Sequence, residues 1–278
     1  AMGPNGNLNR ISDYEIELGG RSLEDRGICG TERFAKQPSA ANCSGFLVGK
    51  NKLVTAGHCM RNQSACNGSV WVFDYKVDYA DQAKVVVDKS DVYKCKRIIS
   101  QTLDSSTKDD YALIELERVV EDREPLKFRT EGAPKKGDKI VVIGHPSGLP
   151  TKIAGGAGIR SVNSVYFQAN LDTYGGNSGS AVFNADTGVV EGILVRGERD
   201  YVHDSSQGCK VSNVLSNAGG RGEDVTRITN IKELMPSGDT GSDNGSGDDG
   251  STGDDSDEDP YGDMPDWLRW ILGLPRRG

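Results

Sequence analysis

Residues 170–183 read NLDTYGGNSGSAVF, a stretch crowded with glycine and serine that runs directly into an apolar segment. Glycine loses more conformational freedom on folding than any other residue, so such a cluster marks backbone with positive φ or space kept for a ligand. A tight turn would account for GNSGS alone. The stretch is also not a G-x-S-x-G elbow, because Ser180 stands where the last glycine would be. Ser178 is therefore a candidate nucleophile only if other residues support it.

The charge of the chain is unevenly distributed. The net charge of −8 over 278 residues comes mainly from residues 237–263, which hold ten acidic and no basic residues. Residues 1–236 hold 30 acidic and 30 basic residues and are therefore neutral. A neutral body offers no electrostatic basis for nucleic-acid binding. The acidic stretch is rich in Gly, Ser and Asp and cannot bury enough apolar surface to fold, so we expect a disordered linker there.

The six cysteines indicate disulfides rather than a metal site. Their number is even, none has C-x-x-C spacing, and the chain has only three histidines. Disulfides imply an oxidising compartment, so we expect a secreted, periplasmic or cell-surface protein with no metal and no other cofactor. No run of about 18 apolar residues is present to span a membrane. The N-terminus lacks the basic and apolar regions of a signal peptide, and residues 1–3 look like a remnant of protein expression.

Short β-type runs broken by turn residues fill residues 40–215. They recur about every 10 residues without long segments of 3.6-residue period, which favours an antiparallel sandwich or barrel over alternating strands and helices. Residues 121–138 are charged and contain two prolines, so we expect them to connect two β units. Further along the chain, apolar residues at every third position predict one amphipathic helix that closes the domain. They are Val225, Ile228, Ile231 and Leu234.

A serine nucleophile needs a base within hydrogen-bond reach, and the base needs a carboxylate to orient it. His58 is the first candidate for the base, because it follows a β run in KLVTAGHC and would lie at the rim of a barrel. His145 precedes a proline in a loop and His203 lies in a polar stretch, so both fit less well. A lone histidine is more often structural, and His58 therefore needs support from its neighbours.

Two cysteines and a carboxylate supply that support. Cys43 and Cys59 lie at two strands that a hairpin would bring together, so a disulfide between them would brace the His58 turn. The stretch DDYALIEL offers Asp109 or Asp110 immediately ahead of an apolar strand. Acidic loops before strands are common, but we favour Asp110 because it directly adjoins the strand and would be held more rigidly.

Four motifs, CSGFLV, TAGHC, DDYALIEL and GNSGSAVF, occur in this order within residues 28–235, and together they resemble the chymotrypsin-fold (trypsin-like) serine peptidases. The resemblance implies an all-β fold of two packed six-stranded antiparallel barrels, with a triad of His58, Asp110 and Ser178 in the cleft between them. It also implies an oxyanion hole formed by the backbone N–H groups of Gly176 and Ser178. The chain order His, Asp, Ser is that of this fold and of neither subtilisins nor α/β-hydrolases.

We expect four segments along the chain. They are an N-terminal segment at 1–27, a peptidase domain at 28–236, an acidic linker at 237–263 and a short amphipathic tail at 264–278. Within the peptidase domain, the first barrel should occupy about residues 28–125 and the second about residues 135–236. The tail carries tryptophans at helical spacing but is too short to span a bilayer, so we expect it to contact either a membrane surface or a protein, the peptidase body included.

Several positions depart from animal trypsins and are similar to the bacterial glutamyl-endopeptidase (V8-like) branch. In animal trypsins, an aspartate before the nucleophile pairs with the new N-terminal amine that zymogen cleavage creates. Here that residue is Asn177, which has no charge, so we do not expect activation by such an ion pair. Thr173 matches a residue on which glutamyl specificity relies, but Leu194 stands where that branch has a histidine. Asp172 lies six residues before Ser178, the offset at which trypsin-like enzymes place the pocket acid, and implies cleavage after Lys or Arg. A turn-capping aspartate is the alternative.

The stretch EGILVRG completes the expected substrate site. The main chain of Val195, Arg196 and Gly197 should pair with the substrate backbone as an added β-strand. We expect the Arg196 side chain to project to solvent, and a preference for acidic groups is the alternative.

Four cysteines remain besides Cys43 and Cys59, and they allow three pairings. We favour Cys66 with Cys95, because both flank β runs of the first barrel. The remaining pair would then be Cys29 with Cys209, which would clasp the N-terminal segment to the second barrel.

These features favour a secreted, monomeric serine endopeptidase that cleaves polypeptides through an acyl-enzyme on Ser178. One alternative is a catalytically silent binding module on a peptidase fold, although all three triad positions are occupied. A second is a peptidase with acidic or apolar primary specificity. A third is a chain that acts mainly through its acidic linker, which lacks the spacing of a calcium loop.

Overall fold

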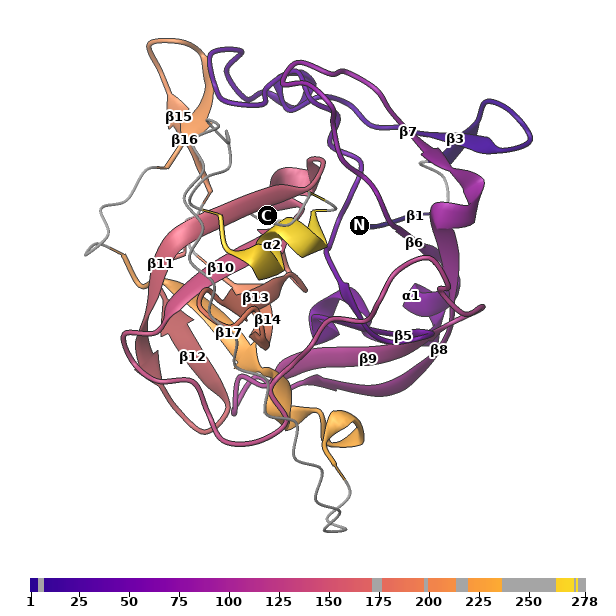
Figure 1. The fold of residues 1–278 in the computed structure, drawn as a ribbon. Helices are drawn as coiled ribbons and strands as arrows, with labels where there is room; N and C mark the ends of the chain where they lie inside the picture. The colour runs from indigo at the N-terminus through magenta and orange to yellow at the C-terminus, as the bar shows by residue number, and fades with distance from the viewer. Residues whose placement is uncertain are drawn as a thin grey trace, which may run out of the picture.

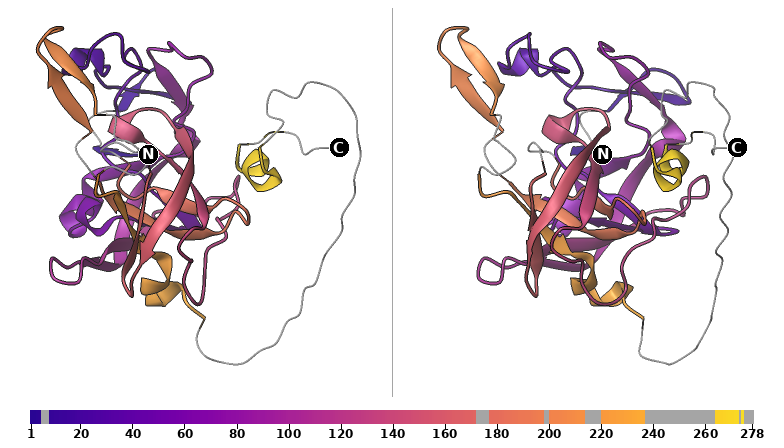
Figure 2. Two further views of the ribbon diagram at one scale, coloured as in Figure 1. Left: turned by 90° about the vertical axis from the view of Figure 1, so that its left-hand side faces the viewer. Right: turned by 60° about the vertical axis from the view of Figure 1, so that its left-hand side comes forward.

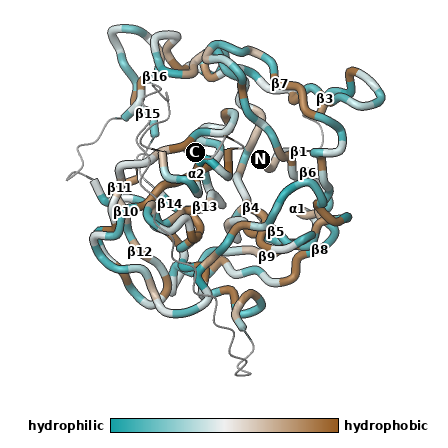
Figure 3. Tube along the Cα trace, viewed as in Figure 1, coloured by the Kyte–Doolittle hydropathy of each residue, from teal (hydrophilic) through white to brown (hydrophobic). Residues whose placement is uncertain are grey.

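The short β runs become strands of two six-stranded antiparallel sheets in the computed structural model (Figure 1 and Figure 2). The structure describes residues 1–4, 8–171, 177–197, 200–213, 220–236, 264–272 and 274. Apolar residues follow the strands, whereas the connecting loops are mainly hydrophilic (Figure 3). The all-β class with two six-stranded sheets, expected from the sequence, is thereby confirmed.

The first sheet has the strand order β1-β6-β8-β9-β5-β4. Its strands are Met2–Pro4 (β1), Ser69–Val72 (β6), Val92–Leu103 (β8), Asp110–Leu116 (β9), Lys52–Thr55 (β5) and Phe46–Gly49 (β4). The long strand β8 shifts register twice against β9, and such irregularities bend a strand and increase its twist. The sheet therefore curves into a half-barrel, and an isolated bridge joins Met2 of edge strand β1 to Cys43, which lies shortly before the other edge strand, β4.

The second sheet closes into a barrel in the order β10-β11-β12-β17-β14-β13. Its strands are Lys139–Gly144 (β10), Lys152–Val162 (β11), Tyr166–Ala169 (β12), Glu223–Arg227 (β17), Val190–Arg196 (β14) and Ala181–Asn184 (β13). Buried apolar side chains fill it, among them Ile140, Val142, Phe167, Val182, Leu194 and Val225. Closure pairs every strand on both sides and leaves no free edge in this sheet.

The helix expected over residues 225–234 is wrong. Val225 lies in β17, between β12 and β14, and two 3₁₀ turns follow at Ile228–Asn230 and Lys232–Leu234. A 3₁₀ turn has three residues, so its period fits the three-residue spacing of the apolar positions better than the α-helical period does. Ile228 and Ile231 are fully buried as a result.

The N-terminal segment is part of the fold. Strand β1, at residues that looked like an expression remnant, pairs antiparallel with β6. Leu8–Arg10 (β2) and Glu15–Leu18 (β3) form a three-stranded sheet with Val85–Asp88 (β7). Alternate residues of β3 and β7 point inward and are buried, as the two-residue period of a half-buried strand requires. The segment that the sequence analysis set apart therefore supplies strands to the body.

Three disulfides join the elements: Cys43–Cys59, Cys66–Cys95 and Cys29–Cys209, the pairs that the sequence analysis favoured. Cys66 lies in the short helix α1 (Gln63–Asn67), and Cys95 lies in β8. Cys209 begins β16 (Cys209–Ser212), which pairs with β15 (Tyr201–Asp204) in a separate hairpin. The third disulfide therefore ties the N-terminal segment to a hairpin inserted between two strands of the second barrel.

Helix α2 (Asp266–Ile271) packs on the second barrel (Figure 2). Its Trp267 ring stacks on Phe183 of β13, and Trp267 Nε1 donates a hydrogen bond to Ala185 O. Among the described residues, no helix has both the length and the apolar character needed to cross a membrane. The expected acidic linker at 237–263 lies outside the described residues.

Candidate active site

His58 lies in a 3₁₀ turn, Gly57–Cys59, that follows β5. The turn needs glycine at position 57, because a Cβ there would overlap the Thr102 carbonyl oxygen. On its other side, Cys59 is buried and joined to Cys43. The turn is thus fixed at both flanks, and the imidazole itself remains 28% exposed. This arrangement gives His58 a fixed place and access to solvent.

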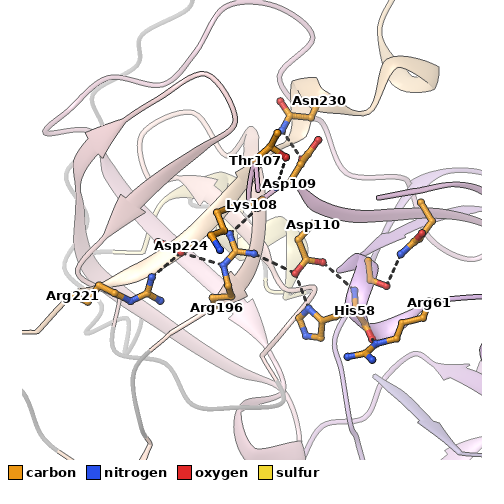
Figure 4. Close-up of polar contacts among 12 residues, drawn as sticks. His58, Arg61, Thr107, Lys108, Asp109, Asp110, Arg196, Arg221, Asp224 and Asn230 are labelled. Carbon is orange, nitrogen blue, oxygen red and sulfur yellow. Dashed lines mark hydrogen bonds and ion pairs between the residues drawn. The ribbon is translucent and has the colours of Figure 1, made fainter. Parts of the chain in front are cut away.

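Asp110 begins β9 and is the carboxylate that faces His58 (Figure 4). Its Oδ1 accepts a hydrogen bond from His58 N at 3.0 Å, and its Oδ2 lies 2.8 Å from His58 Nδ1. A carboxylate oxygen can only accept when ionised, so Nδ1 carries the proton and Nε2 is left as the acceptor. The neighbouring Asp109 instead accepts from Asn230 Nδ2 at 2.9 Å, and burial raises the pKa of its carboxyl. Of the two adjacent candidates, only Asp110 therefore orients the imidazole.

Ser178 lies in a turn that is bonded to the first barrel. Its carbonyl oxygen accepts from Ser44 N at 2.8 Å and lies 3.8 Å from Cys59 Sγ, next to His58 in the chain. Gly179 has φ +91°, and a Cβ there would overlap the Ser44 carbonyl oxygen, so only glycine fits. In the described part of the chain, no hydrogen bond joins the Ser178 hydroxyl to His58. Catalytic hydrogen bonds often tighten only once substrate is bound.

Asn177 supports this turn from within. Its side chain is buried, and its Oδ1 accepts from Ser180 Oγ at 3.1 Å. A Cβ on Gly144 of β10 would overlap Ser180 Oγ, so this glycine makes the close approach possible. The Asn177 side chain therefore takes part in a hydrogen bond between two neutral groups within the turn. Gly176, one of the two expected oxyanion-hole residues, lies outside the described residues.

The expected substrate-binding residues fall into two groups. Asp172 and Thr173 lie outside the described residues. Leu194 and Val195 are buried in β14, and both main-chain groups of Leu194 bond to the nucleophile turn. Leu194 N donates to Ser180 O at 3.0 Å, and Leu194 O accepts from Gly179 N at 2.7 Å. Leu194 thus holds the turn in place, and no main-chain group of it is left for a substrate.

Arg196 does not project to solvent, and that expectation is wrong. Its Nε lies 3.2 Å from Asp224 Oδ2, its Nη1 lies 3.5 Å from Asp110 Oδ2, and its Nη2 donates to Lys108 O at 2.8 Å. Asp110 and Asp224 are both buried. A buried carboxylate needs a charged or hydrogen-bonding partner, which accounts for the inward position of the guanidinium.

The sequence analysis also missed Glu223, a buried residue at the start of β17. Its carboxylate lies against Gly197, where any Cβ would overlap the carboxylate oxygens. Gly197 follows directly on Arg196 in the segment expected to pair with substrate. The signal was present in the sequence as the acidic pair Glu223–Asp224 directly before Val225, the first of the regularly spaced apolar residues that end the domain.

The other two histidines have no comparable partners. His145 is buried, stacks on Tyr75, and has its Nδ1 3.0 Å from Leu149 O; burial lowers its pKa well below the usual value. His203 is exposed on the hairpin strand β15. Ligand atoms of Cys43, His58 and Cys59 lie within 4.8 Å of one another. The two sulfurs are bonded to each other, however, and cannot serve as thiolate ligands to a metal.

A family model and several solved structures are similar to this chain. A family model described as the trypsin-like peptidase domain matches residues 43–193. Among solved structures, the active form of the Rv3671c protease from M. tuberculosis is 16% identical with a TM-score of 0.42, over 68% of this chain and 70% of that chain. A Glu endopeptidase in complex with MPD is 15% identical with a TM-score of 0.47, over 84% and 94% of the two chains.

Proposed function

This chain belongs to the trypsin-like peptidase family, and from that premise we propose that it is a serine endopeptidase that acts through an acyl-enzyme on Ser178. The observation that carries the proposal is the pair of hydrogen bonds from His58 to Asp110. They hold one imidazole tautomer with Nε2 free to accept a proton, which is what a serine nucleophile requires.

The reaction follows from these positions. Ser178 Oγ attacks the scissile carbonyl carbon while its proton moves to His58 Nε2, and the carbonyl electron pair moves to oxygen. The backbone N–H groups of Gly176 and Ser178 would stabilise that oxyanion. Collapse of the intermediate breaks the C–N bond as His58 donates its proton to the leaving amine. In the second half of the reaction, His58 takes a proton from water as the water attacks the acyl-enzyme ester. The ester C–O bond then breaks, the carboxylic acid product leaves, and His58 returns the proton to Ser178 Oγ.

Labelling with a fluorophosphonate probe tests the proposal directly. The probe should react with the wild type, and Ser178→Ala should abolish the label while circular dichroism shows an intact fold. Ser161→Ala, a serine on the outer face of β11, is the matched control and should be labelled as the wild type is. A wild type that resists labelling and hydrolyses no peptide would favour the silent binding module instead.

We further propose cleavage after Lys or Arg. Asp172 supports this preference by its offset from Ser178, which is the offset at which trypsin-like enzymes place the pocket acid. A carboxylate in the pocket would favour a substrate cation and disfavour a side chain that cannot pair with it. Peptide-library cleavage measures this, with Asp172→Ser as the variant and the exposed Glu131→Gln as a control. Cleavage by the wild type after Glu or after large apolar residues would reject it.

We also propose that the protein is secreted, that it is a monomer and that its C-terminal tail contacts its own second barrel. The three disulfides support an oxidising compartment. For the tail, the stacking of Trp267 on Phe183 supports contact with the chain's own barrel rather than with a membrane. Sedimentation with anionic liposomes separates the two: the full chain and a form that ends at Pro236 should remain equally in solution. Sedimentation of only the full chain would support the membrane version.

A further inference from the structure

A row of alternating charges leads from the surface of the second barrel to His58 (Figure 4). Arg221 Nη1 lies 2.9 Å from Asp224 Oδ2, and the same oxygen lies 3.2 Å from Arg196 Nε. Arg196 Nη1 lies 3.5 Å from Asp110 Oδ2, which in turn lies 2.8 Å from His58 Nδ1. Every side chain in this row is charged or can become charged. The row is therefore a continuous electrostatic connection from the second barrel to the imidazole of His58.

Arg196 is the link that crosses between the two barrels. It ends β14 of the second barrel, whereas Asp110 and the Lys108 carbonyl belong to the first. The side chains of Asp110 and Asp224 are 2% and 3% exposed, so neither carboxylate is well screened by water. Gln168 Nε2 also donates to Asp224 at 3.0 Å and fixes that end. The guanidinium is therefore held between two buried carboxylates by bonds from three of its nitrogens.

We propose that Arg196 is a positioning residue for Asp110 and a charge that opposes protonation of His58. This inference rests on the proposed function, because it assigns Arg196 a role in the same reaction. Asp110 Oδ2 is shared between the guanidinium and His58 Nδ1. Arg196 therefore fixes where that oxygen lies, and its positive charge offsets part of the field that Asp110 exerts on the ring.

His58 must be unprotonated to take the proton from Ser178, and a nearby cation disfavours the imidazolium. Other charged groups near the ring are Arg61, which follows the His58 turn and donates to its carbonyl, and Asp109, which points to Asn230. Lys108 is exposed and meets Arg196 only through its backbone. Of these groups, Arg196 is the cation that contacts the carboxylate bonded to the ring.

NMR titration of the histidine ring signals tests this without relying on activity. The chain has three histidines, and His145 is buried and stays neutral, so His58 and the exposed His203 supply the titrating signals. Arg196→Gln should raise the titration midpoint of His58 by roughly 0.5 to 1 pH unit, because one cation near Asp110 is lost. His203 should not move in the same samples, which makes it an internal control.

Two further variants separate charge from structure. Arg196→Lys keeps the charge and should shift the His58 midpoint by less than half as much as Arg196→Gln does. Arg227→Gln removes an arginine of β17 whose guanidinium bonds, within the described part of the chain, to backbone carbonyls of Asn163, Ser164 and Gly132, and it should leave the midpoint unchanged. In active protein, the acid limb of kcat/KM should move with the midpoint in each variant.

An unchanged His58 midpoint in Arg196→Gln would overturn the proposal, as would equal shifts in Arg196→Gln and Arg227→Gln. Equal shifts in the Gln and Lys variants of Arg196 would overturn the assignment to charge. A failure of the proposed function looks different. In that case neither the wild type nor any variant hydrolyses peptides, while the His58 midpoint still responds to Arg196→Gln.

Discussion

The indole of Trp267 stacks on the phenyl ring of Phe183, with centroids 5.2 Å apart and planes inclined by 24°. Trp267 Nε1 also donates to Ala185 O at 2.8 Å, and a Cβ on Gly188 would overlap the Trp267 side chain. A residue more than 80 positions further along the chain is thus docked on the β13–β14 hairpin. Three features therefore hold the indole in place: the stacked ring pair, the hydrogen bond and the space left by the missing side chain of Gly188.

We expect Trp267→Ala to undock α2. The loss of the stacked pair and the hydrogen bond should weaken docking by about 2–3 kcal/mol. Hydrogen exchange of the amides in Asp266–Ile271 should then accelerate by roughly 30- to 150-fold. Trp270→Ala is the matched control, because that indole is 47% exposed, and it should accelerate exchange far less. Equal effects of the two variants would contradict the docking contact.

Asp110→Asn should lower kcat/KM by about 10⁴-fold, because an amide can stabilise the wrong imidazole tautomer and cannot balance the imidazolium. Asp109→Asn is the neighbouring control. Asp109 bonds to Asn230 and not to His58, so kcat/KM should change far less than in Asp110→Asn. The measurement is initial-rate hydrolysis of a chromogenic peptide by folded variants. Comparable losses in both would show that the wrong carboxylate has been assigned.

Replacing Cys43 and Cys59 by alanine should reduce activity as well as stability. The bridge closes a loop of 16 residues, and the chain-entropy model assigns such a loop about 3 kcal/mol. Because the bridge flanks His58, we expect kcat/KM to fall too. The Cys66→Ala, Cys95→Ala double variant lies away from the imidazole and should lose stability only. Denaturant unfolding and peptide hydrolysis of the two double variants provide the comparison, and equal activities would count against a bracing role.

Gly179→Ala should prevent formation of the Ser178 turn. The residue has φ +91°, and the new methyl group would overlap Ser44 O and Thr55 Oγ1. Gly208→Ala is the control: Gly208 has φ +71° but open space around it, so the cost there is about 1 kcal/mol of backbone strain. Thermal unfolding should show a small loss for Gly208→Ala and a much larger loss, or no soluble protein, for Gly179→Ala. Similar stabilities would mean that the turn can relax.

His145 should make the fold sensitive to acid. Burial lowers its pKa well below 6.5, so the folded state keeps it neutral while the unfolded state binds a proton as pH falls below that value. The unfolded state then binds more protons, and the free energy of unfolding falls by up to about 1.4 kcal/mol per pH unit. His145→Gln should therefore lose about 1–2 kcal/mol less than the wild type between pH 7 and pH 5, measured by urea unfolding. Parallel losses would falsify the buried neutral state.

The sequence by itself determined those features that depend on residues close together in the chain. Short β runs separated by turn residues require an antiparallel β fold, and an even set of cysteines outside metal spacing implies disulfides. Glycines around Ser178 and the Cys59 next to His58 identify the two turns that hold these side chains. Each of these signals lies within a few neighbouring residues, so no knowledge of the packing is needed to detect it.

The spacing of Val225, Ile228, Ile231 and Leu234 shows where local patterns are insufficient. A three-residue period is compatible with an irregular helix and equally with a strand followed by 3₁₀ turns. The choice depends on Glu223–Arg227 pairing with both β12 and β14 to close the barrel. Those partners lie up to 60 residues earlier in the chain, and their hydrogen bonds outweigh the weak local preference.

Only the tertiary structure decided which charged groups meet. Asp109 and Asp110 are adjacent in the chain, but only Asp110 lies in β9, and the position of that strand beside β5 places its side chain against His58 while Asp109 bonds to Asn230. Arg196 and Asp110 lie 86 positions apart on different barrels. They meet because the packing of the two barrels places the Arg196 guanidinium between two buried carboxylates, one from each barrel. No residues that neighbour Arg196 or Asp110 in the chain indicate this contact.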